Sequence, residues 1–210
     1  MNNELKLKIL ERLNSVKREG MKELISYLTN KTDFFEAPAS TRFHSNYKGG
    51  LAQHSHNVTE LLIHKNNQFN LNLTNDTIYI TGYLHDICKC NIYKESIKLR
   101  KNISNEWEGY KTFSIEDDLP IGHGEKSVIL LQQFIKLTLE EVLMIRWHMG
   151  GFSPKEDYPQ FSKACEKFKS VCALHSADIE SSYMLEYVSE PEVCSVKEYN
   201  DFVNSQQSKK

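Results

Sequence analysis

The feature that most constrains the fold is the spacing of apolar residues, which is helical along most of the chain. In residues 5–28 they recur every three or four positions, and Gly20 divides this stretch into two expected helices. Further helices are expected at residues 51–69, 74–89, 124–134, 138–147 and 168–187, with a shorter one starting near Tyr158. Between residues 94 and 119 polar and apolar residues alternate instead, which predicts a small β-hairpin. The expected fold class is therefore all-α, a helical bundle with a small inserted β-hairpin.

The length of 210 residues suits one domain with short accessory segments. We expect residues 1–32 to form a helical extension packed on the core, and residues 33–188 to form the main domain, which carries the hairpin. Residues 33–46 have no periodicity and predict an ordered loop, whereas residues 189–210 are expected to be a flexible tail. The N-terminal helices could pair across a homodimer.

Charge and composition exclude several classes of protein. The chain has 26 basic and 28 acidic residues, a net charge of −2, so a surface for long nucleic acid is not expected. No apolar run approaches the roughly 18 residues that span a bilayer, which argues against a membrane protein. The five cysteines are odd in number and lack CxxC spacing, which favours reduced thiols in a cytoplasmic protein over a disulfide framework.

A set of histidines and aspartates has the composition of a metal site. Its members are His54, His85, Asp86, His123, His148 and Asp178. Imidazole and carboxylate ligands suit divalent first-row metals, and a metal in an open site makes bound water nucleophilic near neutral pH. Any single member is more simply explained as a core histidine or a helix-capping aspartate. The whole set favours metal binding.

The segments around these residues form five motifs in a fixed order. They are residues 47–55 (YKGGLAQHS), 83–89 (YLHDICK), 122–127 (GHGEKS), 146–151 (RWHMGG) and 174–178 (LHSAD). Together they resemble the motifs of the HD-domain metal-dependent phosphohydrolase superfamily, over residues 43 to 183. The resemblance implies an HD-domain helical bundle that binds one or two divalent metal ions (Mn, Fe, Ni, Co, Zn or Mg). It also implies a first site of His54, His85, Asp86 and Asp178, and a second at which His123 and His148 join Asp86.

Cationic residues near the motifs are candidates for binding a phosphate group. Lys89 lies one helical turn after His85, and Lys126 lies near an expected helix N-terminus, where backbone amides favour anions. With Asp86 these two lysines are the expected catalytic residues. Lys89 and Lys126 are also expected to bind substrate, together with His44, Arg42 and Arg146. The expected reaction is hydrolysis of a nucleotide or related small phosphate ester by metal-activated water, with Asp178 or Glu125 helping to deprotonate that water.

Three alternatives stay open at this point. A 3′-5′ exoribonuclease fits the first motif, although such enzymes usually carry an additional OB-type domain and the acidic charge disfavours it. A cyclic-dinucleotide phosphodiesterase is disfavoured because residues 148–154 read HMGGFSP, not the HHExxDGxGYP pattern of that family. A non-catalytic nucleotide sensor, with metals in a purely structural role, is the third alternative.

Overall fold

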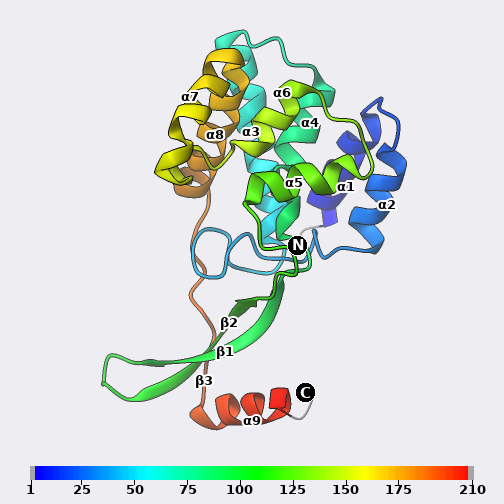
Figure 1. Ribbon diagram of the computed structural model, residues 1–210. Coiled ribbons are helices and arrows are strands. Elements are labelled where there is room, and N and C mark those ends of the chain that lie inside the picture. The colour runs from blue at the N-terminus through cyan, green and yellow to red at the C-terminus, as the bar shows by residue number, and fades with distance from the viewer. Residues whose placement is uncertain (1–2, 208–210) are drawn as a thin grey trace.

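The computed structural model describes residues 3–207, and it consists of a helical body from which a small sheet extends (Figure 1). The helices of the body are α1 (Asn3–Ser15), α2 (Met21–Asn30), α3 (Gly50–Phe69), α4 (Asn75–Leu84), α5 (His123–Gln132), α6 (Leu139–Arg146), α7 (Tyr158–Lys167) and α8 (Lys169–Glu180). Short 3₁₀ turns cover Ile87–Lys89, Gly150–Phe152 and Lys155–Asp157, and a π-helix covers Ser181–Leu185. No helix among the described residues is long and apolar enough to cross a membrane.

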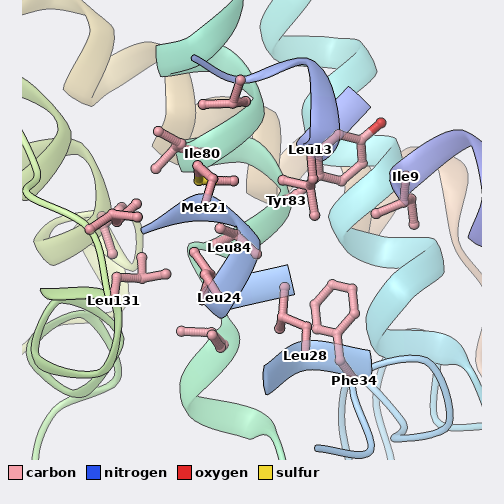
Figure 2. Packing of buried hydrophobic residues seen from close by; sticks show 14 of the residues in the cluster. Ile9, Leu13, Met21, Leu24, Leu28, Phe34, Ile80, Tyr83, Leu84 and Leu131 are labelled. Carbon is pink, nitrogen blue, oxygen red and sulfur yellow. The ribbon is translucent and has the colours of Figure 1, made fainter. Parts of the chain in front are cut away.

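The N-terminal helices pack their apolar faces onto α4 and α5. Leu13 of α1 and Leu24 and Leu28 of α2 are fully buried in one cluster with Tyr83 and Leu131 (Figure 2). The division at Gly20 is confirmed. Gly20 has a φ of 85°, and a Cβ there would collide with the carbonyl oxygen of Phe134, so only glycine suits this close approach.

A second apolar cluster joins α3 to α6 and α8. Val58 and Leu62 of α3 are fully buried against Met144, Val171 and Leu174. Helix α3 therefore packs against α4 along one side and α8 along another, and it forms the centre of the body. The helices that carry the motif residues are held together by these two clusters.

A buried ion pair ties the α1–α2 connection to α6. Arg18 donates to both carboxylate oxygens of Glu141, at 2.6 and 3.0 Å, and the Glu141 side chain is fully buried. Glu141 also completes a capping box with Thr138 and accepts a hydrogen bond from Thr77 of α4. Burial alone would raise the pKa of Glu141, but these hydrogen bonds hold that pKa below its ordinary value.

The sheet corrects the expected fold class. The hairpin is present as β1 (Tyr93–Lys101) and β2 (Trp107–Ile115), paired antiparallel with Tyr93 opposite Ile115. A third strand, β3 (Val193–Cys194), pairs antiparallel with β2, so an all-α fold with only a hairpin is wrong. The protein is mostly helical with a three-stranded antiparallel sheet. Two residues are too few to show the alternation that signals a strand.

The third strand comes from the segment that we expected to be a flexible tail. After β3 the chain forms α9 (Val196–Gln207), which packs against β1 and β2. The helix begins with reciprocal bonds, because Ser195 N–H donates to Glu198 Oε2 and Glu198 N–H donates to Ser195 Oγ. Residues 208–210 of that predicted tail, and residues 1–2 of the extension, lie outside the described residues.

Candidate metal centre

Helix ends and neighbouring turns bring the predicted ligands to the middle of the helical body. His54 lies in α3, His85 follows the last residue of α4, and Asp86 precedes the 3₁₀ turn Ile87–Lys89. His148 lies two residues after α6, Asp178 lies in the last turns of α8, and His123 is the first residue of α5. His85 and Asp86 therefore do not share one continuous helix, as the expected helix at residues 74–89 required.

Three of these residues, His54, His85 and Asp178, form what we call the inner cluster. One ligand atom from each lies within 4.8 Å of the others. His54 Nε2 is 3.2 Å from Asp178 Oδ1 and 3.3 Å from His85 Nε2. Both histidines are fully buried, so their nitrogens face one another away from bulk solvent.

Helices α3 and α4 must approach closely for His54 and His85 to meet. Gly82 of α4 makes this possible, since a Cβ there would lie 2.6 Å from Thr59 Oγ1 and 2.9 Å from Thr59 Cα. The carbonyl of Gly82 also accepts a hydrogen bond from His85 Nδ1 at 2.9 Å. A carbonyl only accepts, so His85 carries its proton on Nδ1 and presents an Nε2 lone pair to the cluster.

A second group, which we call the outer cluster, contains Asp86, Cys88, His123 and His148. Ligand atoms of the first three lie within 4.8 Å of one another. Cys88 Sγ is 3.4 Å from His123 Nδ1 and 4.0 Å from Asp86 Oδ1, and His148 Nε2 is 3.3 Å from Asp86 Oδ1. His123 is exposed, whereas the side chains of the other three members are buried.

His148 has a buried nitrogen that the described residues leave without a hydrogen bond. Its Nδ1 donates to the carbonyl of Ile145 at 2.7 Å, which fixes the proton there. Its Nε2 is fully buried and lies 3.3 Å from Asp86 Oδ1 without a hydrogen bond of good geometry, and although burial lowers the pKa of His148, the Asp86 carboxylate raises it. A buried polar atom of this kind is costly unless it has a ligand, and a metal ion meets that need.

Asp86 contacts both clusters, one with each carboxylate oxygen. Oδ2 lies 3.7 Å from His54 Nε2, 3.6 Å from His85 Nε2 and 2.7 Å from Lys89 Nζ. Oδ1 lies beside His148 and Cys88. Burial would raise the pKa of Asp86, but Lys89 and the neighbouring histidines hold it well below its ordinary value. Asp86 is therefore an anion placed between two groups of potential ligands.

The two inner histidines differ in charge. Burial lowers the pKa of His85 to about 4, so this ring is neutral near pH 7. Burial also favours a lower pKa at His54, but hydrogen bonds to Asp178 and Glu186 outweigh it and raise the pKa to about 10. The proton on His54 Nε2 lies where a cation beside Asp86 and Asp178 would replace it. The donor set of buried imidazoles and carboxylates thus fits a divalent ion.

Sequence reasoning missed Glu186, which holds His54 in place. Its side chain is 1% exposed and accepts from His54 Nδ1 at 2.9 Å and Ser45 Oγ at 2.7 Å, and also from Ser181. It follows the π-helix Ser181–Leu185, a rare element that occurs often at functional sites. Although burial opposes ionisation, His54 lowers the pKa of Glu186 to about 2. No residue pattern in the sequence signals this element.

Two of the predicted substrate-binding residues lie at the metal centre. The Lys89 ammonium pairs with Asp86, and its side chain is 12% exposed. The His44 ring lies 5.0 Å from the His54 ring, and its Nε2 is buried without a hydrogen-bond partner among the described residues. Both side chains therefore lie beside the candidate metal centre.

The other three cations have different surroundings. Lys126 is buried and pairs with Asp117, and Arg146 pairs with Glu125 at 2.6 Å and Asp157 at 3.3 Å. The Arg42 guanidinium lies 5.0 Å from the centre of the Phe43 ring. Arg42 lines a cavity of about 640 Å³ between the loop at residues 41–47, the sheet and the segment that leads to β3. None of the metal-centre residues lines that cavity.

No protein-family model, curated protein or solved structure matches this chain.

Proposed function

We propose that this protein is a metal-dependent phosphohydrolase that acts on a small phosphate ester, such as a nucleotide, at a centre for two divalent ions. The observation that carries the proposal is the position of Asp86, whose two oxygens face two different groups of ligands. A bridging carboxylate of this kind is what a binuclear hydrolytic centre requires. The order of the five motifs, which resembles that of the HD-domain phosphohydrolases, is a second and independent support.

In this proposal the inner position is held by His54, His85, Asp86 and Asp178. The outer position is held by Asp86, His123 and His148. Divalent ions, when bound at these positions, would supply a water nucleophile active near neutral pH and would polarise the phosphoryl oxygens. The ligand atoms of the inner position are nitrogen and oxygen, and several first-row metal ions accept such a set.

The remaining side chains orient these ligands and the substrate. Glu186, Gly82 O and Ile145 O accept the Nδ1 protons of His54, His85 and His148, so that the Nε2 atoms of these three histidines face the centre. Lys89 brings a positive charge beside Asp86, where it stabilises negative charge on a phosphoryl group. Glu125 is paired with Arg146, so Asp178 is the better placed carboxylate to accept a proton from water.

Small substrates are favoured over long nucleic acid by the charge balance around the centre. Arg146 and Lys126 are each paired with a carboxylate, and the chain has a net charge of −2. Long RNA or DNA needs a continuous set of unpaired cations for phosphate contacts. A compact phosphate ester needs only the metal ions and a few protein groups, and two lie close enough to supply them: Lys89, itself paired with Asp86, and the His44 ring, whose pKa burial lowers.

The test is metal analysis of protein purified without chelator, combined with hydrolysis of a generic phosphodiester and a nucleotide panel in added manganese. We expect about two ions per chain and turnover that chelator removes and manganese restores. Asp201→Asn, an exposed change in α9, is the matched control and should leave both unchanged. Bound metal without turnover on any member of the panel would contradict the proposal and favour the sensor alternative.

A further inference from the structure

We propose that the thiolate of Cys88 is a ligand of the outer metal position, with Asp86, His123 and His148, and that this position selects a thiophilic ion such as Zn²⁺. The inference rests on the proposed function only in that the outer cluster binds metal, and it does not require that the protein hydrolyse anything. The six predicted ligands contain no sulfur, so Cys88 adds both a ligand and a metal preference to the centre.

The position of the Cys88 side chain is the first support. Cys88 lies in the 3₁₀ turn that follows Asp86, and its backbone N–H donates to Ser127 Oγ of α5 at 3.3 Å. The turn and this bond place Sγ at 3.4 Å from His123 Nδ1 and 4.0 Å from Asp86 Oδ1. The residue is 1% exposed, so the sulfur faces these two ligand atoms and not solvent.

Two of the separations within the outer cluster match one ion among its ligand atoms. Zinc bonds are about 2.3 Å to sulfur and about 2.0–2.1 Å to nitrogen or oxygen. Around a tetrahedral ion, ligand atoms at such bond lengths lie roughly 3.3–3.6 Å apart. The observed separations are 3.4 Å for Cys88 Sγ to His123 Nδ1 and 3.3 Å for His148 Nε2 to Asp86 Oδ1. Cys88 Sγ and Asp86 Oδ1 are 4.0 Å apart, and His148 lies outside the group of three residues whose ligand atoms are within 4.8 Å of one another, so an ion would draw the four ligands closer together.

His148 provides a second observation that points to an ion in this cluster. Its Nε2 is fully buried and faces Asp86, without a hydrogen bond from any described residue. Nε2 lies 3.3 Å from Asp86 Oδ1, so one cation shared between them, a ring proton without metal or a metal ion with it, satisfies both groups. An ion coordinated by His148, Asp86, Cys88 and His123 satisfies all four groups at once.

Sulfur is the donor that determines which ion is preferred. A set of one thiolate, two imidazoles and one carboxylate matches tetrahedral zinc, whereas magnesium and calcium prefer oxygen ligands. The inner cluster has nitrogen and oxygen donors alone. The two positions would therefore differ in metal preference, with zinc in the outer one even when manganese fills the inner one.

Metal binding requires the loss of the thiol proton. Burial raises the pKa of Cys88 to about 12, so without metal the residue is a thiol near pH 7. On binding, the S–H bond breaks, the S–metal bond forms, and the proton is released to solvent. The simpler explanation, a buried cysteine acting as a small apolar residue, accounts for the burial but not for a sulfur placed between two polar ligand atoms.

Cobalt substitution tests the inference directly, because a Co²⁺–thiolate bond gives a near-ultraviolet charge-transfer band that nitrogen and oxygen ligands do not give. The full chain is titrated with Co²⁺ alone, and bound metal is counted at each point. We expect the band in the wild type and in Cys90→Ala, and its loss in Cys88→Ala. Cys90 is the matched control, since it lies two residues away and packs against the apolar cluster of α1 and α2.

Zinc-loaded wild-type protein gives a second reading that needs no variant. X-ray absorption should show a sulfur neighbour at about 2.3 Å from part of the zinc. Metal bound without a sulfur neighbour or a thiolate band would overturn the inference, as would a wild type that binds no metal. Turnover in a protein that lacks the band leaves the proposed function standing and removes Cys88. The band without turnover would support Cys88 as a ligand and count against the proposed function.

Discussion

The inner and outer clusters share Asp86 but differ in how firmly their side chains are held. In the inner cluster both histidines are fully buried. The Nδ1 of His54 donates to Glu186, and the Nδ1 of His85 donates to the carbonyl of Gly82. In the outer cluster His123 is exposed, and its only described ring contact is with Cys88. Preorganised ligands lose less freedom when they bind a metal, so the inner position should retain its ion more tightly.

One centre could in this way combine a firmly retained ion with an exchangeable one. Helices α3, α4 and α8 pack around the inner cluster through the apolar contacts of the body. The outer cluster uses the turn after α4, the first residue of α5 and the segment after α6, which are ends of elements. Ends of elements open at lower free energy than packed interiors.

Asp86→Ala should have the largest effect, because it removes the one carboxylate that both clusters share. We expect loss of both ions and of turnover to background. The change also leaves the buried Lys89 ammonium unpaired, which should lower the free energy of unfolding by about 3–5 kcal/mol. Metal analysis and denaturant unfolding measure the two effects separately. Retention of either ion would show that Asp86 does not bridge the clusters.

His148→Ala should separate the clusters. We expect the outer ion to be lost and the inner ion to be kept. His148 Nε2 lies 3.3 Å from Asp86 Oδ1, and although the His148 ring lies 5.0 Å from the His85 ring, it makes no hydrogen bond to either inner histidine. Metal content should fall from about two ions to about one per chain. His175→Ala is the useful comparison, since His175 donates to the carbonyl of His148 at 2.7 Å and should alter affinity without removing an ion. Two ions bound to His148→Ala would mean that the division of ligands between the inner and outer positions is not the one proposed.

Lys89→Met tests which of the two predicted catalytic lysines acts at the centre. Lys89 lies at Asp86, whereas Lys126 is paired with Asp117. Removing a cation that stabilises transition-state charge typically costs on the order of 10²-fold in kcat. We expect a loss of that order for Lys89→Met and a much smaller one for Lys126→Met, measured on the same phosphodiester. Equal losses would place Lys126 at the substrate as well.

The apolar spacing of the sequence predicted the helices of the body but not where some of them end. The expected helix at residues 74–89 ends at Leu84, and His85 and Asp86 both lie in the break before the 3₁₀ turn Ile87–Lys89. No glycine or proline marks that end, which is determined by contacts with α3 and α5. Strand β3 was also beyond prediction, because two residues carry no period and the strand depends on pairing with Gly109 and Tyr110 of β2.

The site was predicted better for residue type than for partners. Motif order pointed to histidines and aspartates that the structure brings into two adjoining clusters around Asp86, which could hold metal ions. Spacing from a histidine also suggested Lys126 and Arg146 as phosphate contacts. In the fold Asp117 pairs with Lys126 and Asp157 pairs with Arg146, and sequence spacing does not predict such tertiary contacts. Glu186 and Cys88 have roles that depend on where a π-helix and a 3₁₀ turn place them, which sequence periodicity does not encode.

Glu186→Ala should have the smallest effect of these changes, and it tests the inner cluster alone. Glu186 does not enter the cluster but accepts the His54 Nδ1 proton, so its loss frees the ring to rotate or to move its proton. Changes in such supporting residues typically weaken metal affinity by about 10- to 100-fold. Chelator competition should show this loss for the inner ion, with the outer ion unchanged.

The variant Glu186→Gln sharpens the same test, because its amide oxygen can still accept from His54. We expect it to recover much of the affinity that Glu186→Ala loses, whereas a role for the negative charge alone would leave the two variants equal. Glu190→Ala, an exposed change nearby in the chain, controls for effects on the C-terminal segment. If Glu186→Ala released the outer ion first, the inner cluster would not be the more firmly held of the two.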